Sequence, residues 1–370
     1  MSKKNGVNAH RGAPAGGISA RGRASRSNKS GRFERHRSES FDDGWSGDAV
    51  VGNDRPPTTV TAENAKAVIT RNDSPDIAFD RSINPYRGCE HGCIYCFARP
   101  THAYLGLSPG LDFETKLFFK PEAAALLRRE LTRSGYMPER IQLGANTDCY
   151  QPIEKRLRIT RGILEVLSEF RHPLGITTKS HLVTRDIDLI APMAEQGLAA
   201  VVVSITTLDR GLARDMEPRA STPQLRIEAI RQLSQAGIPV IVSVAPVIPG
   251  LTDHEIEEIV GTAAAAGARY AHCSILRLSH ELGDLFKEWL ASERPDRAAR
   301  VMSLVRQTRG GKENDSRFGL RMVGEGPVAD LIKDRFRKAR RRFGLDRKID
   351  ALRTDLFKSP PAPGDQLTLL

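Results

Sequence analysis

The sequence predicts an α/β protein, in which a partial (β/α)6 barrel of the TIM type carries a C-terminal helical extension and a disordered basic N-terminal tail. From about residue 75, short apolar runs alternate with helical periodicity, as in βα units around a parallel sheet. Glycines stop several helices just before the next run, at Gly197, Gly237 and Gly267. Six such units favour a partial barrel over an open doubly wound sheet.

The expected strands are the apolar runs at 77–84, 141–145, 174–178, 199–205, 238–247 and 269–276. The helices expected between them have apolar residues at helical spacing and cover 157–170, 187–193, 225–233 and 256–260. After the sixth run, the segment 282–290 places its apolar residues on one helical face. A last helix should begin at Gly326-Pro327 and bury Val328, Leu331, Ile332 and Phe336.

We therefore expect four regions along the chain: a disordered basic tail over 1–65, the barrel over 75–310, a helical region over 311–350 and a flexible Pro-rich tail over 351–370. The helical region ends in a basic cluster, formed by Arg335, Arg337, Lys338, Arg340, Arg341 and Arg342. This cluster is either a solvated helix face or a surface that binds phosphate groups.

Composition excludes several classes of protein. Hydrophobic residues make up 39% of the 370 residues and charged residues 27%, which allows a sizeable core. No apolar run reaches the roughly 18–20 residues that span a bilayer, and no apolar stretch follows the N-terminus as in a secretory signal peptide. Five cysteines are too few for a disulfide scaffold. We therefore expect a cytoplasmic protein that makes no membrane contact.

The net charge of +11 is unevenly distributed. Up to Arg37 the chain has ten basic residues and one acidic residue, Glu34. Such a segment cannot bury enough apolar surface to become ordered by itself. It is either a solubility tail or an arm that binds nucleic acid through release of counterions from the phosphates.

In barrels of this kind the chemistry collects at the C-terminal ends of the strands. After the first strand, a C-x3-C-x2-C pattern is formed by Cys89, Cys93 and Cys96. Three thiolates this close in sequence can surround one soft metal centre. A structural zinc site would need a fourth ligand, which Cys149, Cys273 or His91 could supply. The alternative is a 4Fe–4S cluster in which one iron has no protein ligand and can bind substrate or cofactor.

The C-x3-C-x2-C loop, with the aromatic Tyr95 before its last cysteine and its place at the head of a six-unit barrel, resembles the radical S-adenosylmethionine (SAM) superfamily. The resemblance covers about residues 75–310. It implies a 4Fe–4S cluster on Cys89, Cys93 and Cys96, with SAM bound to the fourth iron. It also implies that the reduced cluster cleaves SAM to a 5′-deoxyadenosyl radical, which abstracts hydrogen from a substrate inside an enclosed site.

The superfamily has a glycine-glycine-acid segment after its second strand, where it holds the SAM amino group. This sequence differs there, because it has Ala145-Asn146-Thr147-Asp148. The resemblance implies that Asn146, Thr147 or Asp148 takes over this hydrogen bonding.

Further SAM contacts are implied at the ends of later strands. Lys179 and Ser204 match positions that contact the SAM carboxylate and ribose in the spore photoproduct lyase branch. The segment with Val247 and Ile248 resembles one whose backbone packs against adenine, as the backbone of Tyr95 also does. As alternatives, Lys179 is a strand-end lysine that reaches solvent and Ser204 a small residue that lines the barrel.

The segments 84–89 and 146–154 resemble bacterial proteins classed near spore photoproduct lyase, which repairs a thymine dimer in DNA. That enzyme has a hydrogen-donating cysteine at the end of its second strand, where this chain has Asn146. Cys149 is the nearest thiol and the candidate catalytic hydrogen donor; otherwise it is a buried structural cysteine or one that tunes the cluster. Cys273, inside the sixth strand, is expected in the core.

The C-terminal residues Gln366–Leu370 resemble the peptide by which bacterial repair proteins bind the replicative sliding clamp, here with leucine in place of the usual final phenylalanine. Together with the basic segments, they favour DNA as partner and a DNA base lesion as substrate. An external electron donor of the flavodoxin or ferredoxin type is implied. The alternatives are radical SAM modification of RNA or protein, and a DNA-binding iron–sulfur redox sensor without turnover.

Overall fold

A computed structural model of the chain describes residues 22–34, 57–347 and 350–360. The strands of its main sheet are β2 (Ile69–Arg71), β3 (Arg81–Ile83), β6 (Ile141–Leu143), β7 (Leu174–Thr178), β8 (Ala199–Ser204), β9 (Val240–Val247) and β10 (Tyr270–Ile275). Their order is β10-β9-β8-β7-β6-β3-β2, and all neighbours are parallel except β2 and β3. Six parallel strands in chain order confirm the α/β prediction. Among the described strands, β10 and β2 remain as two edges.

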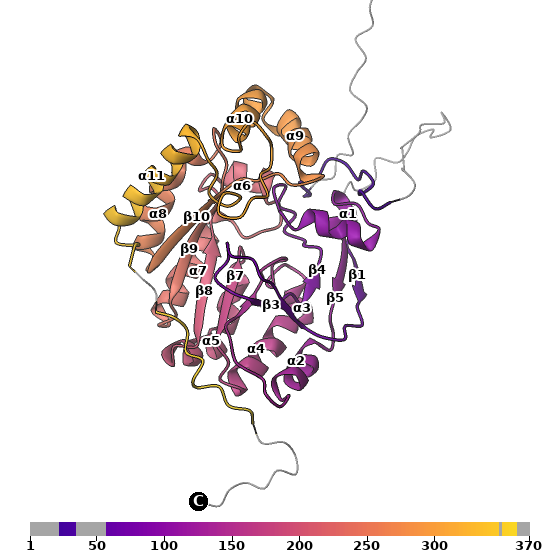
Figure 1. Ribbon diagram of the computed structural model, residues 1–370, viewed down its shortest axis with the longest axis vertical. Helices are drawn as coiled ribbons and strands as arrows, with labels where there is room; N and C mark the ends of the chain where they lie inside the picture. Colours follow the sequence, from indigo (N-terminus) through magenta and orange to yellow (C-terminus); the bar gives the residue numbers. More distant parts are fainter. Residues whose placement is uncertain (1–21, 35–56, 348–349, 361–370) are drawn as a thin grey trace, which may run out of the picture.

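A second, smaller sheet was not expected from the sequence. It contains β1 (Thr59–Ala62), β4 (Tyr86–Arg87) and β5 (Lys116–Phe119) in the order β1-β5-β4. Figure 1 shows this sheet beside the main one, with α1 (Leu111–Thr115) at its upper end. The chain enters the cysteine segment directly from β4, so this small sheet anchors the start of that segment.

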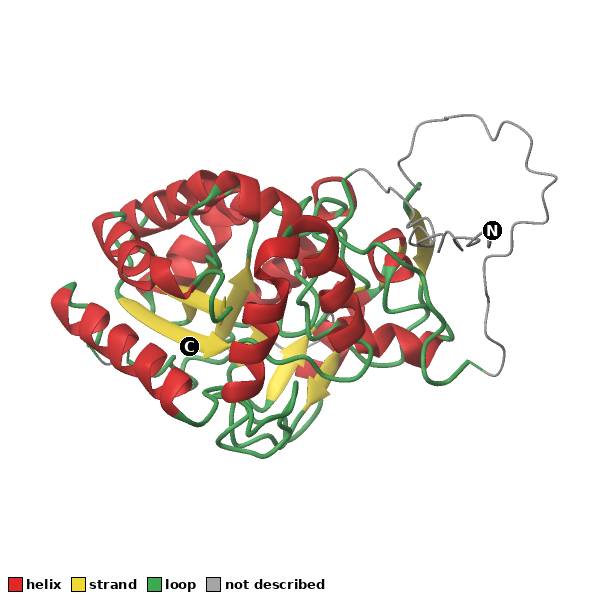
Figure 2. Ribbon diagram, turned by 90° about the horizontal axis from the view of Figure 1, so that it is seen from above, coloured by secondary structure: helices red, strands yellow, loops and turns green. Residues whose placement is uncertain are grey.

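The helices surround the strands, as the view from above shows (Figure 2). Besides α1 they are α2 (Ala123–Leu131), α3 (Glu154–Leu157), α4 (Ile159–Glu169), α5 (Ile187–Glu195), α6 (Arg210–Met216), α7 (Pro223–Gln235), α8 (Ile256–Ala265), α9 (Leu282–Glu293), α10 (Pro295–Gln307) and α11 (Pro327–Arg342). Short 3-10 helices are η1 (Arg99–Leu105), η2 (His181–Asp186) and η3 (Asp253–Glu255). In Figure 1, α9 and α10 lie together at the top, and α11 runs beside α8.

The two faces of the main sheet differ in polarity. One row of paired residues is apolar and fully buried, and it consists of Ile83, Leu143, Ile176, Val201 and Val240. The row at the alternate positions near the strand ends is polar, and it includes Ser204, Ser243 and His272. Because side chains alternate between faces along a strand, the apolar row packs under the helices and the polar row lines the inside of the half-barrel.

The prediction of a disordered tail over 1–65 is wrong for residues 22–34 and for β1. Ala24 and Ser25 are fully buried, and we call residues 22–34 the strap. Three basic residues of the strap pair with acids on or just before α9: Arg26 with Glu293, Lys29 with Glu288 and Arg32 with Glu281. These three charges of the strap are therefore neutralised by ion pairs within the protein. Residues 1–21 and 35–56 lie outside the described part of the chain.

The expected flexible tail over 351–370 is also wrong in its first half. The Arg353 N–H donates to the Gly197 carbonyl (3.0 Å), and the Lys358 N–H donates to the Phe170 carbonyl (3.1 Å). Between these anchors, the Phe357 ring packs with its centroid 5.4 Å from that of Tyr136 and 5.6 Å from that of His172. Gln366–Leu370 lies outside the described residues.

The last predicted helix is confirmed as α11, but one of its buried residues is wrong. Ile332 and Phe336 are buried as expected and Val328 is half-buried, whereas Leu331 is 59% exposed. The buried face instead includes Ala329 and continues to Ala339, at helical spacing. In the described ranges, none of the helices combines the length and apolar character needed to cross a membrane.

His172 provides a test of this packing through pH. The ring is fully buried, and its Nε2 lies 2.8 Å from the Tyr136 hydroxyl. Burial lowers the pKa of His172 to about 4, and the charge of Arg81 makes a smaller contribution in the same direction. Since an unfolded histidine has a pKa near 6.5, the neutral ring contributes up to about 3 kcal/mol above that pH, and this is lost as pH falls toward 4.

We therefore expect the wild type to lose more unfolding free energy than a His172→Gln variant between pH 7 and pH 4, measured by chemical denaturation. Contributions that both proteins share cancel in the difference. Parallel pH profiles would contradict a buried neutral histidine.

Candidate active site

Three cysteines gather on the loop after β4. Cys89 and Cys93 are buried, Cys96 is half-buried, and all three are free thiols. Burial raises the pKa of each thiol, and the charges of Asp148, Cys93 and Cys96 raise that of Cys89 further. The charges of Cys93 and Cys96 thus act on Cys89, and that of Cys96 acts on Cys93.

Two glycines let the loop turn this tightly. Gly88 and Gly92 have φ of +73° and +66°, in the left-handed region that favours glycine. A Cβ on Gly92 would also lie 2.8 Å from a carboxylate oxygen of Glu114. The loop therefore needs glycine at this position for both its conformation and its contact with α1.

Arg99, at the start of η1, holds the loop from inside. Its side chain is fully buried, and it donates to the carbonyls of Cys93 (Nε, 2.8 Å) and Gly92 (Nη2, 2.8 Å). Nη1 donates to the carbonyls of Pro109 (3.1 Å) and Gly110 (3.0 Å). The guanidinium thus joins the cysteine loop to the segment before α1.

Glu114 is the counter-ion of Arg99 and is equally buried. Its carboxylate also accepts from the strap, from the N–H groups of Ala24 (3.2 Å) and Ser25 (3.0 Å). Arg23 donates to the Glu114 carbonyl at 2.7 Å. The strap, α1 and the cysteine loop therefore meet at one buried ion pair, which the sequence did not reveal.

Three thiols make up the donor set of the cysteine loop. Within the described residues, no three or more His, Cys, Asp or Glu side chains are gathered as they must be around one metal ion. A zinc site would need four donors at about 2.0–2.3 Å from the same ion. A 4Fe–4S cluster accepts a wider set, because each thiolate binds a different iron. By its chemistry, a set of three thiols on one loop fits such a cluster and leaves one iron free of protein ligands.

Asp148 is one of the residues expected to bind SAM, but its carboxylate accepts hydrogen bonds from the protein itself. One oxygen accepts from the Thr178 hydroxyl (2.8 Å) and the Tyr150 N–H (2.8 Å), and the other accepts from the Lys179 N–H (2.7 Å). His91 Nδ1 lies 3.3 Å from that second oxygen. Burial opposes ionisation, but His91 and these donors together lower the pKa of Asp148 to about 2. The carboxylate thus ties the cysteine loop to the end of β7.

The two residues before Asp148 differ in availability. Thr147 is buried and donates to the Tyr86 carbonyl (2.7 Å). Asn146 is half-buried, and its N–H donates to Asn84 Oδ1 (2.9 Å), while its side-chain amide forms no hydrogen bond to a described residue. Of these three candidates, Asn146 is therefore the one with hydrogen-bonding groups left for a ligand.

A buried network fixes Tyr95 against the end of β8. The Tyr95 hydroxyl lies 2.9 Å from Thr206 Oγ1 and donates to the carboxylate of Glu217. Glu217 pairs with Arg226, whose Nη1 donates to the Ser204 carbonyl (3.1 Å). The sequence did not single out Glu217 or Arg226, because they belong to a loop and a helix that meet only in the folded chain.

Lys179, just after β7, contacts the Tyr95 ring. Its Nζ is 5.7 Å from the centroid of the Tyr95 ring, and its charge lowers the thiol pKa of Cys93 and Cys96 against the larger effect of burial. Among the described residues it forms no ion pair with a carboxylate. An ammonium group without a counter-ion at this position is suited to an anionic ligand.

Val247 and Ile248 are both buried. The Val247 carbonyl accepts from the Leu276 N–H (2.9 Å), and Ile248 packs in the same apolar cluster as Cys93 and Tyr95. Ile248 therefore packs beside the cysteine loop. Ser204 is also buried, at the end of β8.

Cys149, the candidate hydrogen donor, does not belong to the cysteine loop. Its thiol is fully buried in the main core, and its sulfur would lie 3.3 Å from a Cβ on Gly144. The charges of Asp148, Glu154 and Asp186 add to burial in raising its pKa. This packing fits the structural alternative better than the hydrogen-donor prediction. Cys273 is half-buried and packs against the same core.

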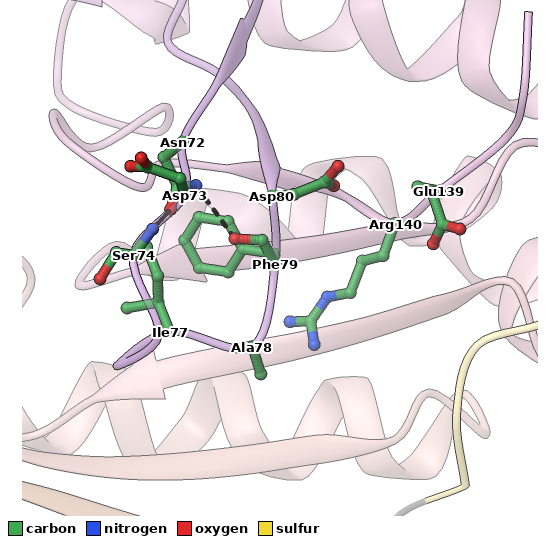
Figure 3. Close-up of a pocket in the computed structure, with 9 residues that line it drawn as sticks. All are labelled: Asn72, Asp73, Ser74, Ile77, Ala78, Phe79, Asp80, Glu139 and Arg140. Atoms are coloured by element: carbon green, nitrogen blue, oxygen red, sulfur yellow. Dashed lines mark hydrogen bonds between the residues drawn. The ribbon is translucent and has the colours of Figure 1, made fainter. Parts of the chain in front are cut away.

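A pocket of about 380 Å³ lies between the β2–β3 loop and the start of β6 (Figure 3). Arg140 extends toward that loop, and its buried Nε has no hydrogen-bond partner in the described structure. Burial lowers the pKa of Arg140. The residues that line this pocket include neither the three thiols nor any predicted SAM contact.

Comparisons with known proteins indicate the family. The family model of the radical SAM superfamily matches residues 83–263. The chain is 42% identical over 233 residues to the uncharacterized protein Rv2578c of Mycobacterium tuberculosis, covering 62% of this chain and 68% of that protein. It is 30% identical over 215 residues to the uncharacterized protein MJ0683 of Methanocaldococcus jannaschii, covering 58% and 76%.

Among solved structures, a spore photoproduct lyase mutant with bound AdoMet and dinucleoside spore photoproduct has a TM-score of 0.54, with 17% identity and coverage of 77% of this chain and 78% of that one. At this identity the likeness concerns the fold.

The Arg99–Glu114 pair yields a prediction about stability. A Glu114→Gln variant leaves a buried guanidinium unpaired, so we expect it to lose about 3–5 kcal/mol of unfolding free energy. We also expect it to bind less iron after anaerobic reconstitution, because the carbonyls of the cysteine loop lose their anchor. Denaturant titration and iron analysis measure the two effects.

The matched control is Glu169→Gln, which breaks the exposed pair of Arg128 and Glu169 and should cost at most about 1 kcal/mol. Equal losses in the two variants would show that the buried pair has no special role.

Proposed function

Because this chain belongs to the radical SAM superfamily, we propose that Cys89, Cys93 and Cys96 ligate its 4Fe–4S cluster and that its substrate is a base lesion in DNA. Membership makes the protein an enzyme that uses SAM and an external electron donor; a flavodoxin or ferredoxin is the proposed donor. The observation that supports the site best is the group of three thiols beside the counter-ion-free ammonium of Lys179.

Each residue of the proposed cofactor site has a role that its surroundings favour. Lys179 binds the SAM carboxylate, since its ammonium has no protein counter-ion. Asn146 binds the amino group through its free side-chain amide. Ser204 serves the ribose, and the backbones of Tyr95 and Val247–Ile248 pack against adenine. Thr147 and Asp148 form hydrogen bonds within the protein and are not direct SAM ligands in this proposal.

When bound, the reduced cluster and SAM together supply a carbon radical that abstracts hydrogen from the substrate. The chain must exclude water from this site and keep its own reactive groups away. The Tyr95–Glu217–Arg226 network serves this purpose, because its hydrogen bonds are satisfied inside the protein. Cys149, enclosed in the core, is not needed as hydrogen donor in this proposal.

DNA is favoured by the likeness of segments 84–89 and 146–154 to photoproduct-lyase-like proteins and by the basic end of α11. On that helix Arg341 is exposed, and Arg337 and Lys338 share the single carboxylate of Asp334. The strap does not add to this support, because its basic residues pair with acids. Contact of Gln366–Leu370 with a sliding clamp remains part of the proposal on the sequence motif alone.

The first test is anaerobic reconstitution with iron and sulfide, followed by reduction with SAM and assay of 5′-deoxyadenosine, with and without ultraviolet-damaged DNA. We expect the wild type to form 5′-deoxyadenosine, and damaged DNA to increase its yield. Cys93→Ala should lose both cluster and product, whereas Cys273→Ala, which removes a thiol outside the loop, should keep both.

A cluster that assembles without ever cleaving SAM would favour the redox-sensor alternative instead. Stimulation by RNA or protein but not by damaged DNA would favour the other enzyme alternative.

Lys179 gives a second test that is independent of substrate. A Lys179→Met variant should keep the cluster absorbance and lose about 10- to 100-fold in SAM affinity, because it removes a charged hydrogen-bond donor. Equilibrium dialysis with labelled SAM measures the change. Lys155→Met, at an exposed lysine on α3, is the control and should bind SAM as the wild type does. Unchanged affinity in the Lys179 variant would remove it from the site.

A further inference from the structure

An exposed aromatic ring lies beside the cysteine loop. Phe97 follows Cys96 directly and is 46% exposed, although its neighbours Ala98 and Arg99 are fully buried. The guanidinium carbon of Arg277 lies 5.6 Å from the centroid of the Phe97 ring. Arg277 is two residues beyond β10, so the pair lies at the end of the sheet where the thiols are.

A second pair of the same kind lies on the segment that contacts the end of β10, and the charge of its arginine acts on Arg277. Phe318 is 60% exposed, and the guanidinium carbon of Arg321 is 4.7 Å from the centroid of its ring. The segment is held at the end of β10, because the Ile275 N–H donates to the Met322 carbonyl (2.9 Å). The buried Arg309 strengthens this contact by donating to backbone carbonyls of both segments. We call Phe97, Arg277, Phe318 and Arg321 the rim.

The rim has an excess of positive charge. Burial and the charge of Arg321 lower the pKa of Arg277, and Asp76 offsets this only in part. Asp76 pairs with Arg321, whereas Arg277 has no carboxylate within ion-pair distance in the described part of the chain. A half-buried guanidinium that lacks a counter-ion is suited to an external anion.

We propose that the rim binds a nucleotide with an unpaired base, which stacks on Phe97 or Phe318 while its phosphate pairs with Arg277. Aromatic faces with interleaved arginines are what single-stranded nucleic acid recognises, since every base has a face to stack and every link carries a negative charge. An acidic peptide would use the charge but would leave the rings exposed. The inference rests on the proposed function, for which it names the groups that hold the substrate strand at the thiol site.

The test measures binding of a short fluorescein-labelled single-stranded DNA to the reconstituted holoenzyme by fluorescence anisotropy across a salt series. RNA of the same sequence and duplex DNA are compared. Phe97→Ala should weaken single-strand binding about 10-fold and leave the salt dependence unchanged, because stacking carries no net charge. Arg277→Gln should weaken binding and reduce the slope of log K against log salt by about 1. Phe97→Tyr should restore the affinity.

The control is Arg133→Gln at an exposed arginine between α2 and β6, which removes the same charge away from the rim. If it weakens single-strand binding as much as Arg277→Gln does, or if neither rim variant changes binding, the proposal is overturned. The proposal is supported if the affinity for either the single-stranded DNA or the single-stranded RNA falls in both rim variants. The strand that binds more tightly then shows whether the preferred nucleotide has deoxyribose or ribose. Binding of the duplex alone contradicts it.

Formation of 5′-deoxyadenosine without added nucleic acid is measured on the same samples. If the rim variants bind single strands as the wild type does and SAM is still cleaved, only this inference is overturned. If the wild type does not cleave SAM but the rim variants bind single strands more weakly, the proposed function is overturned and the rim is still a binding site.

Discussion

The buried ion pair between Arg99 and Glu114 is the contact on which the candidate active site depends. A charge in the protein interior costs several kcal/mol unless it is paired and hydrogen-bonded. Arg99 meets this requirement only because the carbonyls of Gly92, Cys93 and Gly110 point toward it. The conformation of the cysteine loop and the burial of the guanidinium are therefore one constraint. Through the strap N–H groups bound to Glu114, the same constraint extends to a segment far earlier in the chain.

The main sheet could be predicted because its signal is local. Strands β7 to β10 are apolar on the face under the helices, and each is followed by a helix with its own periodicity, so the alternation is visible in one dimension. The small sheet has no such signal: β4 has 2 residues, and β1 pairs with β5, which lies more than fifty positions away in the sequence. Short strands that form through distant pairing leave no pattern to read.

The candidate site divides in the same way. The cysteine spacing is a local pattern, and it identified the three thiols from the sequence. Glu217 and Arg226 required the fold, because their pairing depends on how the loop after α6 meets α7. Asp148 shows a further limit of sequence patterns: its place after β6 suggested a ligand contact, whereas its hydrogen bonds with Thr178 and Lys179 make it a link between strand ends. Residue type and position predicted its presence at the site but not its partners.

Charge density is a poor guide to function in this chain, and the presence or absence of counter-ions is a better one. The strap is strongly basic in sequence, yet Arg26, Lys29 and Arg32 each face a carboxylate, so little of their field remains for a partner. Lys179 and Arg277 stand in unremarkable sequence, yet neither has an ion-pair partner among the described residues, and both lie at the thiol end of the sheet. A partly buried cation without a counter-ion carries a desolvation cost that an anionic ligand can remove. The cations that matter for binding are therefore identified by the partners they lack, and only the folded chain reveals which they are.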